Sequence, residues 1–266
     1  MKKRIQPNQI IQKKATNTPI TMLTAYDYSQ ALILDEMGID IVLVGDSLGN
    51  VFAGHENTLP VTMENMIYHT QAVARGSKNS LILADMPFLS YQISCEQAKT
   101  NAGRLIQDGG AQAVKIEVTN SSLNYIKDII DMGIAVVGHI GFTPQSVYKL
   151  GGYKVQGKTE KESDMIINTA KRLEALGCFA IILEMVPANL AKIISEILTI
   201  PTIGIGAGSS CDGQVLVTND LLGFSDKFTP KFVKKYANLN KTIKKAIREF
   251  KDEVEKKSFP GKEHSF

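Results

Sequence analysis

The chain has 266 residues, 44% of them hydrophobic, which is enough for a large core and matches one (β/α)8 barrel as well as two small domains. Its 30 basic and 27 acidic side chains give a formal net charge of +3, too slight to indicate nucleic-acid binding but compatible with small anionic substrates. The basic leader, residues 1–16, lacks the apolar segment of a signal peptide, and no stretch approaches the roughly 18 apolar residues that span a bilayer. These features argue against nucleic-acid and membrane partners and favour a cytoplasmic protein.

Short runs rich in β-branched residues recur along the chain, each followed by a longer amphipathic stretch. They span residues 20–27, 41–47, 81–88, 113–118, 135–141, 180–186, 202–208 and 214–220. Their apolarity is continuous rather than alternating, as strands buried on both faces require. We therefore expect eight strands in a parallel sheet.

Amphipathic segments between these runs predict helices. They span residues 29–37, 63–75, 95–107, 121–132 and 160–176. Glycines that could adopt a left-handed cap after these helices are Gly38, Gly76, Gly109, Gly133 and Gly177. Because no linker or change of composition interrupts the pattern, we predict one (β/α)8 barrel domain over residues 1–266, with a basic leader and a C-terminal amphipathic helix. The connection between the last two strands is too short for a crossover helix.

The C-terminal tail is rich in lysine and has apolar residues at helical spacing. These are Leu239, Ile243, Ile247, Phe250 and Val254. We interpret this segment as a solvated amphipathic helix that closes the barrel or packs on a neighbouring subunit.

Acidic side chains stand where successive apolar runs end. Asp46, followed by Ser47, ends the second run, and Asp85 ends the third. Catalytic side chains of a barrel lie at the carboxyl ends of its strands, so these residues should converge. Neighbouring buried carboxylates repel unless a cation lies between them or one is protonated, and Mg2+ commonly takes one or two carboxylates. Each acid alone could instead cap the following helix, but acids at three successive strand ends favour a metal site.

Lys115 and Glu117 are two residues apart in the fourth run, so their side chains point the same way. They could form a structural ion pair, or Lys115 could meet an anionic substrate while Glu117 completes the metal site. His139 in the fifth run has a possible supporting role, although a lone strand histidine is more often a core residue. Glu184 ends the sixth run; an apolar environment would raise its pKa and make it a candidate general base, with a helix cap as the alternative.

Two other features have structural interpretations. The stretch GIGAG, residues 204–208, lacks the third glycine of a dinucleotide-binding loop, since position 209 is Ser209, and better fits a tight turn at a barrel end that lets the backbone approach a ligand. Cys95, Cys178 and Cys211 are odd in number and form no CxxC pair. We expect reduced, structural thiols rather than disulfides or a zinc site.

An ordered set of motifs resembles the ketopantoate hydroxymethyltransferase family from about residue 18 onward. The motifs are VGDSLG, GHENTLPVT, ADMPF, VKIE, GHIGFTPQS, GGYKVQGK, LEMVP, IGIGAG and FPGKEHSF. The resemblance implies a (β/α)8 barrel of the phosphoenolpyruvate/pyruvate type. It also implies transfer of a one-carbon unit from 5,10-methylenetetrahydrofolate to 3-methyl-2-oxobutanoate, giving 2-dehydropantoate and tetrahydrofolate in pantothenate synthesis.

The same resemblance carries family roles onto matching positions. Metal-associated acids fall on Asp46, Asp85 and Glu117, with one Mg2+ per subunit. The 2-oxoacid-binding residues fall on Asp46, Ser47, Asp85 and Lys115, and the proton acceptor falls on Glu184. It further implies a homodecamer. The alternatives are another metal-dependent 2-oxoacid lyase or mutase of this barrel type, or a non-catalytic 2-oxoacid-binding barrel.

Overall fold

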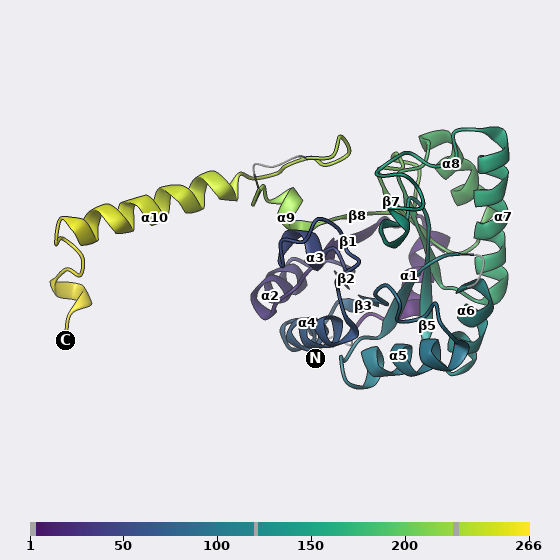
Figure 1. Ribbon diagram of the computed structural model, residues 1–266, viewed down its shortest axis with the longest axis horizontal. Helices are drawn as coiled ribbons and strands as arrows, with labels where there is room; N and C mark the ends of the chain where they lie inside the picture. Colours follow the sequence, from purple (N-terminus) through teal and green to yellow (C-terminus); the bar gives the residue numbers. More distant parts are fainter. Residues whose placement is uncertain (1–3, 120–121, 226–228) are drawn as a thin grey trace. The chain divides into compact units, whose positions relative to one another are not determined.

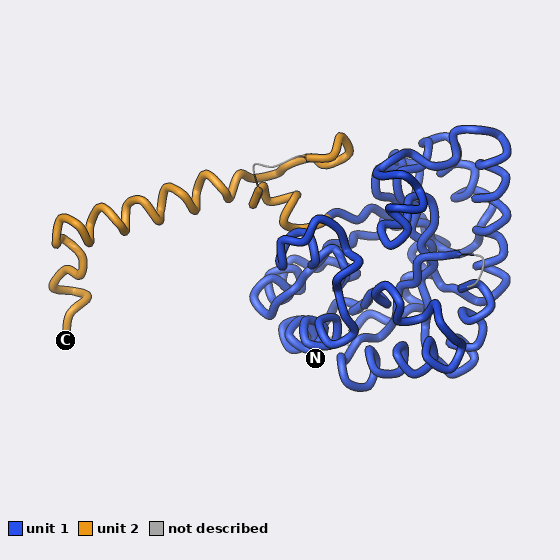
Figure 2. The backbone as a smooth tube through the Cα atoms, in the orientation of Figure 1, with its two compact units in different colours: residues 1–216 blue, residues 217–266 orange. Residues whose placement is uncertain are grey.

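The computed structural model describes residues 4–119, 122–225 and 229–266. The chain divides into two compact units, residues 1–216 and residues 217–266, coloured blue and orange in Figure 2. All eight strands lie in the first unit. Among the described residues, no helix combines the length and apolarity needed to cross a bilayer.

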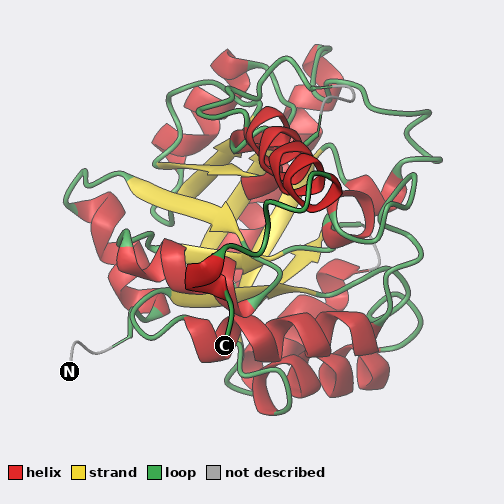
Figure 3. Cartoon of the chain, turned by 90° about the vertical axis from the view of Figure 1, so that its left-hand side faces the viewer, coloured by secondary structure: helices red, strands yellow, loops and turns green. Residues whose placement is uncertain are grey.

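The first unit is built on a closed barrel of parallel strands, each hydrogen-bonded to the next and the last to the first (Figure 1). The strands are β1 Ile20–Thr24, β2 Ile41–Val44, β3 Leu81–Asp85, β4 Ala113–Glu117, β5 Ala135–Gly141, β6 Ala180–Glu184, β7 Thr202–Ile205 and β8 Gly213–Leu216. Every residue of β2, β3 and β4 is buried. Helices cover the outer face of the sheet (Figure 3), and apolar side chains of the strands pack together in the interior. The predicted parallel (β/α)8 architecture is confirmed.

Most predicted strands run a few residues past the observed carboxyl end, because those residues turn over the mouth of the barrel. The largest difference is at β8: residues 218–220, predicted as strand, begin helix α9 Thr218–Leu221. The sequence Thr-Asn-Asp suits a helix start better than a strand interior. Residues 206–212, all described, join β7 to β8 without a helix, as the short connection predicted.

Helices of the first unit are α1 Pro7–Ala15, α2 Tyr28–Glu36, α3 Leu48–Val51, α4 Met63–Gly76, α5 Cys95–Gln107, α6 Ser122–Asp131, α7 Glu160–Leu176 and α8 Ala188–Ile197, with one 3-10 turn at Pro144–Ser146. All five predicted helices are present, although residue 121, the predicted start of α6, lies outside the described residues. The hydroxyls of Thr62, Ser94 and Thr159 cap α4, α5 and α7 by accepting a backbone N–H of the first turn.

The glycine caps are only partly as predicted. Gly38, Gly133 and Gly177 have the expected positive φ, but Gly76 and Gly109 do not. At Gly76 a Cβ would lie 2.4 Å from the carbonyl oxygen of Tyr28, so the residue permits close packing of α2 against α4.

The basic leader has a structural role that its composition did not reveal. Helix α1 places Ile10, fully buried, among the apolar side chains of the barrel strands. Lys14 pairs with Asp212 at 2.9 Å and Lys13 pairs with Asp40, which stand just before β8 and β2 respectively. The leader therefore covers the amino end of the barrel, opposite the carboxyl ends of the strands. Its first three residues lie outside the described residues.

The second unit contains α9 and the long helix α10 Leu239–Glu255, followed by a 3-10 turn at Lys262–His264. Asn238 caps α10 by accepting the N–H of Lys241 at 3.0 Å. The predicted helix is confirmed with all five apolar positions inside it, and none of its residues is buried.

Candidate functional site

The carboxyl ends of β2 to β6 bring together every residue predicted for the site. Asp46 and Ser47 follow β2, Asp85 ends β3, Lys115 and Glu117 lie in β4, His139 lies in β5 and Glu184 ends β6. Parallel register sets them side by side: Asp85 is opposite Lys115, and Glu117 is opposite His139. Five of these side chains are buried, and Ser47 and Glu184 are half-buried. Charged groups so deep in a barrel need specific partners.

Asp46, Ser47 and Asp85 form one corner of the site. The backbone N–H of Asp46 donates to Asp85 Oδ2 at 2.9 Å, and the hydroxyls of Ser47 and Tyr26 are 2.9 Å apart. A Cβ on Gly45 would lie 2.7 Å from Ser47 Oγ, so any larger residue would force the Ser47 hydroxyl to move. Neither acid caps the helix that follows it: α3, after Asp46, has no side-chain cap, and α5, after Asp85, is capped by Ser94.

Lys115 is the buried cation of the site. Its Nζ lies 3.2 Å from Asp85 Oδ1 and 3.2 Å from His139 Nδ1. Burial alone would lower the pKa of Lys115, but the surrounding carboxylates, Asp85 foremost, raise it overall. The amine therefore stays protonated, which suits pairing with an anion and disfavours attack on a carbonyl.

His139 connects Lys115 to Glu184 and is more central than the sequence indicated. Its Nε2 lies 3.2 Å from Glu184 Oε2, although not aligned as a hydrogen bond, and its Nδ1 is 3.8 Å from Glu117 Oε1. Burial first, and the charge of Lys115 second, hold the pKa of His139 well below its usual range. The ring is therefore neutral, with Nδ1 accepting from the ammonium and Nε2 carrying the proton.

Glu184 has the protonation behaviour of a base that works near neutrality. Burial raises its pKa to about 7, against the opposing effect of Lys115. Its strand partner is Gly141, where a Cβ would lie 2.3 Å from the Glu184 carbonyl oxygen, and Met185 after it adopts the left-handed region with φ 47°. The chain thus turns sharply just beyond the carboxylate.

Gln145 is a site residue that the sequence analysis missed. It lies in the 3-10 turn after β5, and its Nε2 donates to Asp46 Oδ2 and to the Met86 carbonyl oxygen, both at 2.9 Å. Its backbone N–H donates to Glu117 Oε2 at 2.9 Å, and its Oε1 accepts from the Tyr91 hydroxyl at 2.8 Å. Gln145 therefore orients two carboxylates, Asp46 through its side-chain amide and Glu117 through its backbone N–H. The only available signal was its place in the motif GHIGFTPQS, directly after a barrel strand.

The cluster of acids is suited to binding a hard divalent cation, because neighbouring carboxylates repel one another when no cation lies between them. Four carboxylates, Asp46, Asp85, Glu117 and Glu184, face one ammonium group, and burial raises the pKa values of Asp85 and Glu117, with the charge of Asp46 adding to both. Asp85 Oδ1 and Glu117 Oε1 are buried without a hydrogen bond within the described part of the chain. All the available donors are oxygens, as Mg2+ prefers.

The site is not a complete cage by itself. Across residues 4–119, 122–225 and 229–266, no three His, Cys, Asp or Glu side chains are arranged to enclose a metal ion. Mg2+ commonly takes only one or two carboxylates and fills its other positions with water and substrate. The arrangement therefore fits a cation held partly by the protein and partly by a bound ligand.

The GIGAG stretch forms a turn, with positive φ at Gly206 and Gly208. The close approach is to protein: a Cβ on Gly208 would lie 2.6 Å from the Cβ of Ala188, at the start of α8. Gly208 therefore allows the turn to pack against α8, and the approach of this turn to a ligand stays a prediction. The three thiols are free, as predicted.

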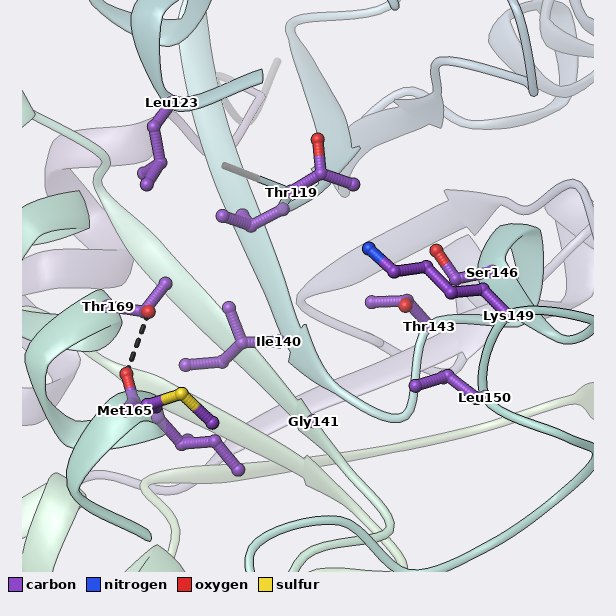
Figure 4. Close-up of a pocket in the computed structure, with 12 residues that line it drawn as sticks. Thr119, Leu123, Ile140, Gly141, Thr143, Ser146, Lys149, Leu150, Met165 and Thr169 are labelled. Atoms are coloured by element: carbon purple, nitrogen blue, oxygen red, sulfur yellow. Dashed lines mark hydrogen bonds between the residues drawn. The ribbon is translucent and has the colours of Figure 1, made fainter. Parts of the chain in front are cut away.

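A separate cavity of about 230 Å³ is lined by the carboxyl end of β5, the turn that follows it, and residues of α6 and α7 (Figure 4). Ile140 and Leu123 line one part, and Lys149, Thr143 and Ser146 line another. Ile140 alternates with His139 along β5, so the strand separates this cavity from the carboxylates.

Comparisons with known proteins agree on one family. A family model described as ketopantoate hydroxymethyltransferase matches residues 4–262. The 3-methyl-2-oxobutanoate hydroxymethyltransferase of Geobacter metallireducens is 54% identical over 257 residues, covering 96% of each chain. The protein of that name from Enterococcus faecalis is 55% identical over 255 residues, covering 96% of this chain and 93% of its own. Phosphoenolpyruvate phosphomutase from Streptomyces platensis subsp. rosaceus has a similar fold: the TM-score is 0.62 at 13% identity, covering 95% of this chain and 88% of that one.

Proposed function

The chain belongs to the ketopantoate hydroxymethyltransferase family, and from this premise we propose that it converts 3-methyl-2-oxobutanoate to 2-dehydropantoate in pantothenate synthesis. The one-carbon unit comes from 5,10-methylenetetrahydrofolate, water supplies the hydroxyl group, and tetrahydrofolate leaves. The observation that carries the proposal is the cluster of four carboxylates, three of them buried, one ammonium group and a neutral histidine at the carboxyl ends of the barrel strands. This cluster suits a small anionic oxoacid held by a divalent cation.

We assign the cation to Asp46 and Asp85, with Glu117 nearby. These are buried oxygen donors that outnumber the single ammonium group of Lys115, and Gln145 orients Asp46 and Glu117 through hydrogen bonds. When bound, Mg2+ would stabilise the negative charge that develops on the keto oxygen of the substrate. Removing one carboxylate of this set should weaken both metal and oxoacid binding.

The oxoacid is held at the same corner. Ser47 offers a hydroxyl, and Lys115 offers a permanently charged ammonium group for the substrate carboxylate or keto oxygen. Because Lys115 remains protonated, its part is to balance charge rather than to form a covalent adduct. His139 accepts a hydrogen bond from this ammonium group and thereby fixes its position.

Glu184 is the proposed base that removes the C3 proton. A pKa of about 7 lets the carboxylate accept a proton readily while still being ionised in a large fraction of molecules at neutral pH. The electron pair of the C3–H bond forms the enolate, which then makes a carbon–carbon bond to the one-carbon unit. Both carbon–nitrogen bonds of the methylene group break. One is replaced by the new carbon–carbon bond and the other by a bond to the oxygen of water, while the two folate nitrogens take up the proton removed from C3 and one proton of the water.

Two measurements test this proposal. With Mg2+ and 3-methyl-2-oxobutanoate in D2O, the wild-type protein should exchange the C3 proton, and with 5,10-methylenetetrahydrofolate it should release tetrahydrofolate. Glu184→Gln should slow exchange by about 10²- to 10⁴-fold while the oxoacid still binds. The matched control is Glu196→Gln, which changes an exposed carboxylate on α8 and should leave both rates unchanged.

The outcomes separate the proposal from its alternatives. Exchange without tetrahydrofolate release would indicate a different reaction of the same enolate, as in a lyase or mutase. Binding of the oxoacid without exchange would indicate a non-catalytic barrel. Near-normal exchange in Glu184→Gln would remove Glu184 from the role of base.

A further inference from the structure

The motif GGYKVQGK, residues 151–158, has no part in the chemistry described so far, yet the structure holds it beside the proposed base. The backbone N–H of Gln156 donates at 2.9 Å to the carbonyl oxygen of Met185, the residue directly after Glu184. Gly157 is buried against α8, where a Cβ would lie 2.5 Å from Leu190 Cδ2. The loop is therefore fixed to the carboxyl end of β6.

Tyr153 is the aromatic residue that this loop presents. Its ring centroid lies 5.0 Å from that of Phe142, with an angle of 36° between the ring planes. Phe142 is fully buried, and its N–H donates to the Glu184 carbonyl oxygen at 2.8 Å. One side of the Tyr153 ring is thus supported by a core residue that is bonded to the base's own backbone.

The rest of Tyr153 remains open to solvent, with 58% of the residue exposed. Partial burial first, and then the charges of Glu184 and Asp46, raise the pKa of its phenol, which places the ring within the electrostatic reach of the site. Fixed aromatic rings with an exposed face are suited to stacking on planar ligands, because such contacts add to the area that is buried.

The charge of the loop is also distinctive. Residues 147–159 contain three lysines, Lys149, Lys154 and Lys158, and no acidic residue. All three lysines are exposed. A ligand that combines planar rings with carboxylates would complement this segment in both shape and charge.

We propose that Tyr153 is the stacking residue for the planar rings of the reduced folate that brings the one-carbon unit. This inference rests on the proposed function, in which the folate must place its one-carbon unit next to C3 of the oxoacid and hence close to Glu184. A ring supported by Phe142 at the mouth of the barrel is positioned for that approach. The anionic glutamate part of the folate then faces the lysines of the same loop.

The test uses the full-length protein loaded with Mg2+ and compares Tyr153→Ala with Tyr153→Phe. Tyr153→Ala should raise the KM for 5,10-methylenetetrahydrofolate about tenfold, since it removes the ring, while Tyr153→Phe should stay within about twofold of wild type. Exchange of the C3 proton in D2O without folate should be within about twofold of wild type in both variants. The matched control is Tyr68→Ala, which removes an exposed tyrosine from the outer helix α4 and should change neither quantity.

Several results would overturn the inference. An unchanged folate KM in Tyr153→Ala would show that the ring does not bind the folate. Equal loss of folate-free exchange would show that Tyr153 supports Glu184 or the fold instead, and an equally weakened Tyr153→Phe would assign the effect to the hydroxyl. If wild-type protein releases no tetrahydrofolate, the proposed function fails as well; if it does and Tyr153→Ala is normal, only this inference fails.

Discussion

Replacing Gln145 by leucine tests whether one neutral amide organises the charged site. Leucine has a similar size but no polar atoms, so the change removes the donors to Asp46 Oδ2 and to the Met86 carbonyl oxygen. The Tyr91 hydroxyl keeps a second partner, the Glu117 carbonyl oxygen at 3.1 Å. Two buried acceptors are therefore left without this donor.

Each buried group that loses its hydrogen bond costs about 1 to 3 kcal/mol, so we expect the free energy of unfolding to fall by about 3 kcal/mol. In a chain of this size that corresponds to a fall in Tm of roughly 6 to 12 °C. The oxoacid KM should also rise, because Asp46 loses the hydrogen bond that orients it. Calorimetry of the metal-free protein and the exchange assay with Mg2+ measure the two effects separately.

Gln71→Leu is the matched control for this substitution. Gln71 lies on the surface of α4 and donates one hydrogen bond to the Asp108 carbonyl oxygen, which water can replace. Its Tm should change by less than about 2 °C. A Gln145→Leu protein that is as stable as this control and binds the oxoacid normally would refute the organising role of Gln145.

Three further predictions follow from other contacts. A base must be ionised to accept a proton, and burial raises the pKa of Glu184 to about 7. The rate of C3 proton exchange should therefore increase as pH rises through 7 and then level off. A flat profile from pH 5 to 9 would contradict this. Gly45→Ala should displace Ser47, whose Oγ would be 2.7 Å from the new methyl group, and raise the oxoacid KM; unchanged kinetics would show that the strand exit adjusts freely. Ile10→Ala should lower the free energy of unfolding by about 2 to 5 kcal/mol, because Ile10 is fully buried. Ile11→Ala, at a residue that is 37% exposed, should lower it by less than about 1 kcal/mol. Equal values for the two variants in urea titrations would show that packing of α1 against the barrel does not stabilise the protein.

The fold was accessible from the sequence because its signal is repeated in eight short apolar runs. Continuous apolar runs such as IVLV of β2 and LILA of β3 are typical of strands with both faces covered, and eight of them alternating with helices favour a barrel. The acids at their ends could also be predicted to converge, since parallel strands place their carboxyl ends at one face. Strand register then set Asp85 opposite Lys115.

The missed features depend on contacts between distant segments, which no local pattern encodes. Gln145 is an uncharged residue in an irregular turn, and its importance comes from Asp46, 99 positions away. The sequence indicated only a basic leader where α1 lies, because Ile10 is the only buried residue of this helix. Gly76 resembled a helix cap, whereas its actual constraint is the backbone of Tyr28 on another helix.

The order of groups across β4, β5 and β6 explains how a base and a permanent cation can share one small site. If Lys115 contacted Glu184 directly, the ion pair would lower the pKa of Glu184 and make it a poor base. Instead Lys115 contacts Asp85 and His139, and the neutral His139 ring, 3.2 Å from each neighbour, stands between the cation and Glu184. The charge of Lys115 is thus balanced mainly by the acids near the proposed metal, while burial keeps Glu184 basic enough to take a proton from carbon. A histidine that burial and the charge of Lys115 keep neutral can therefore separate the cation from the base.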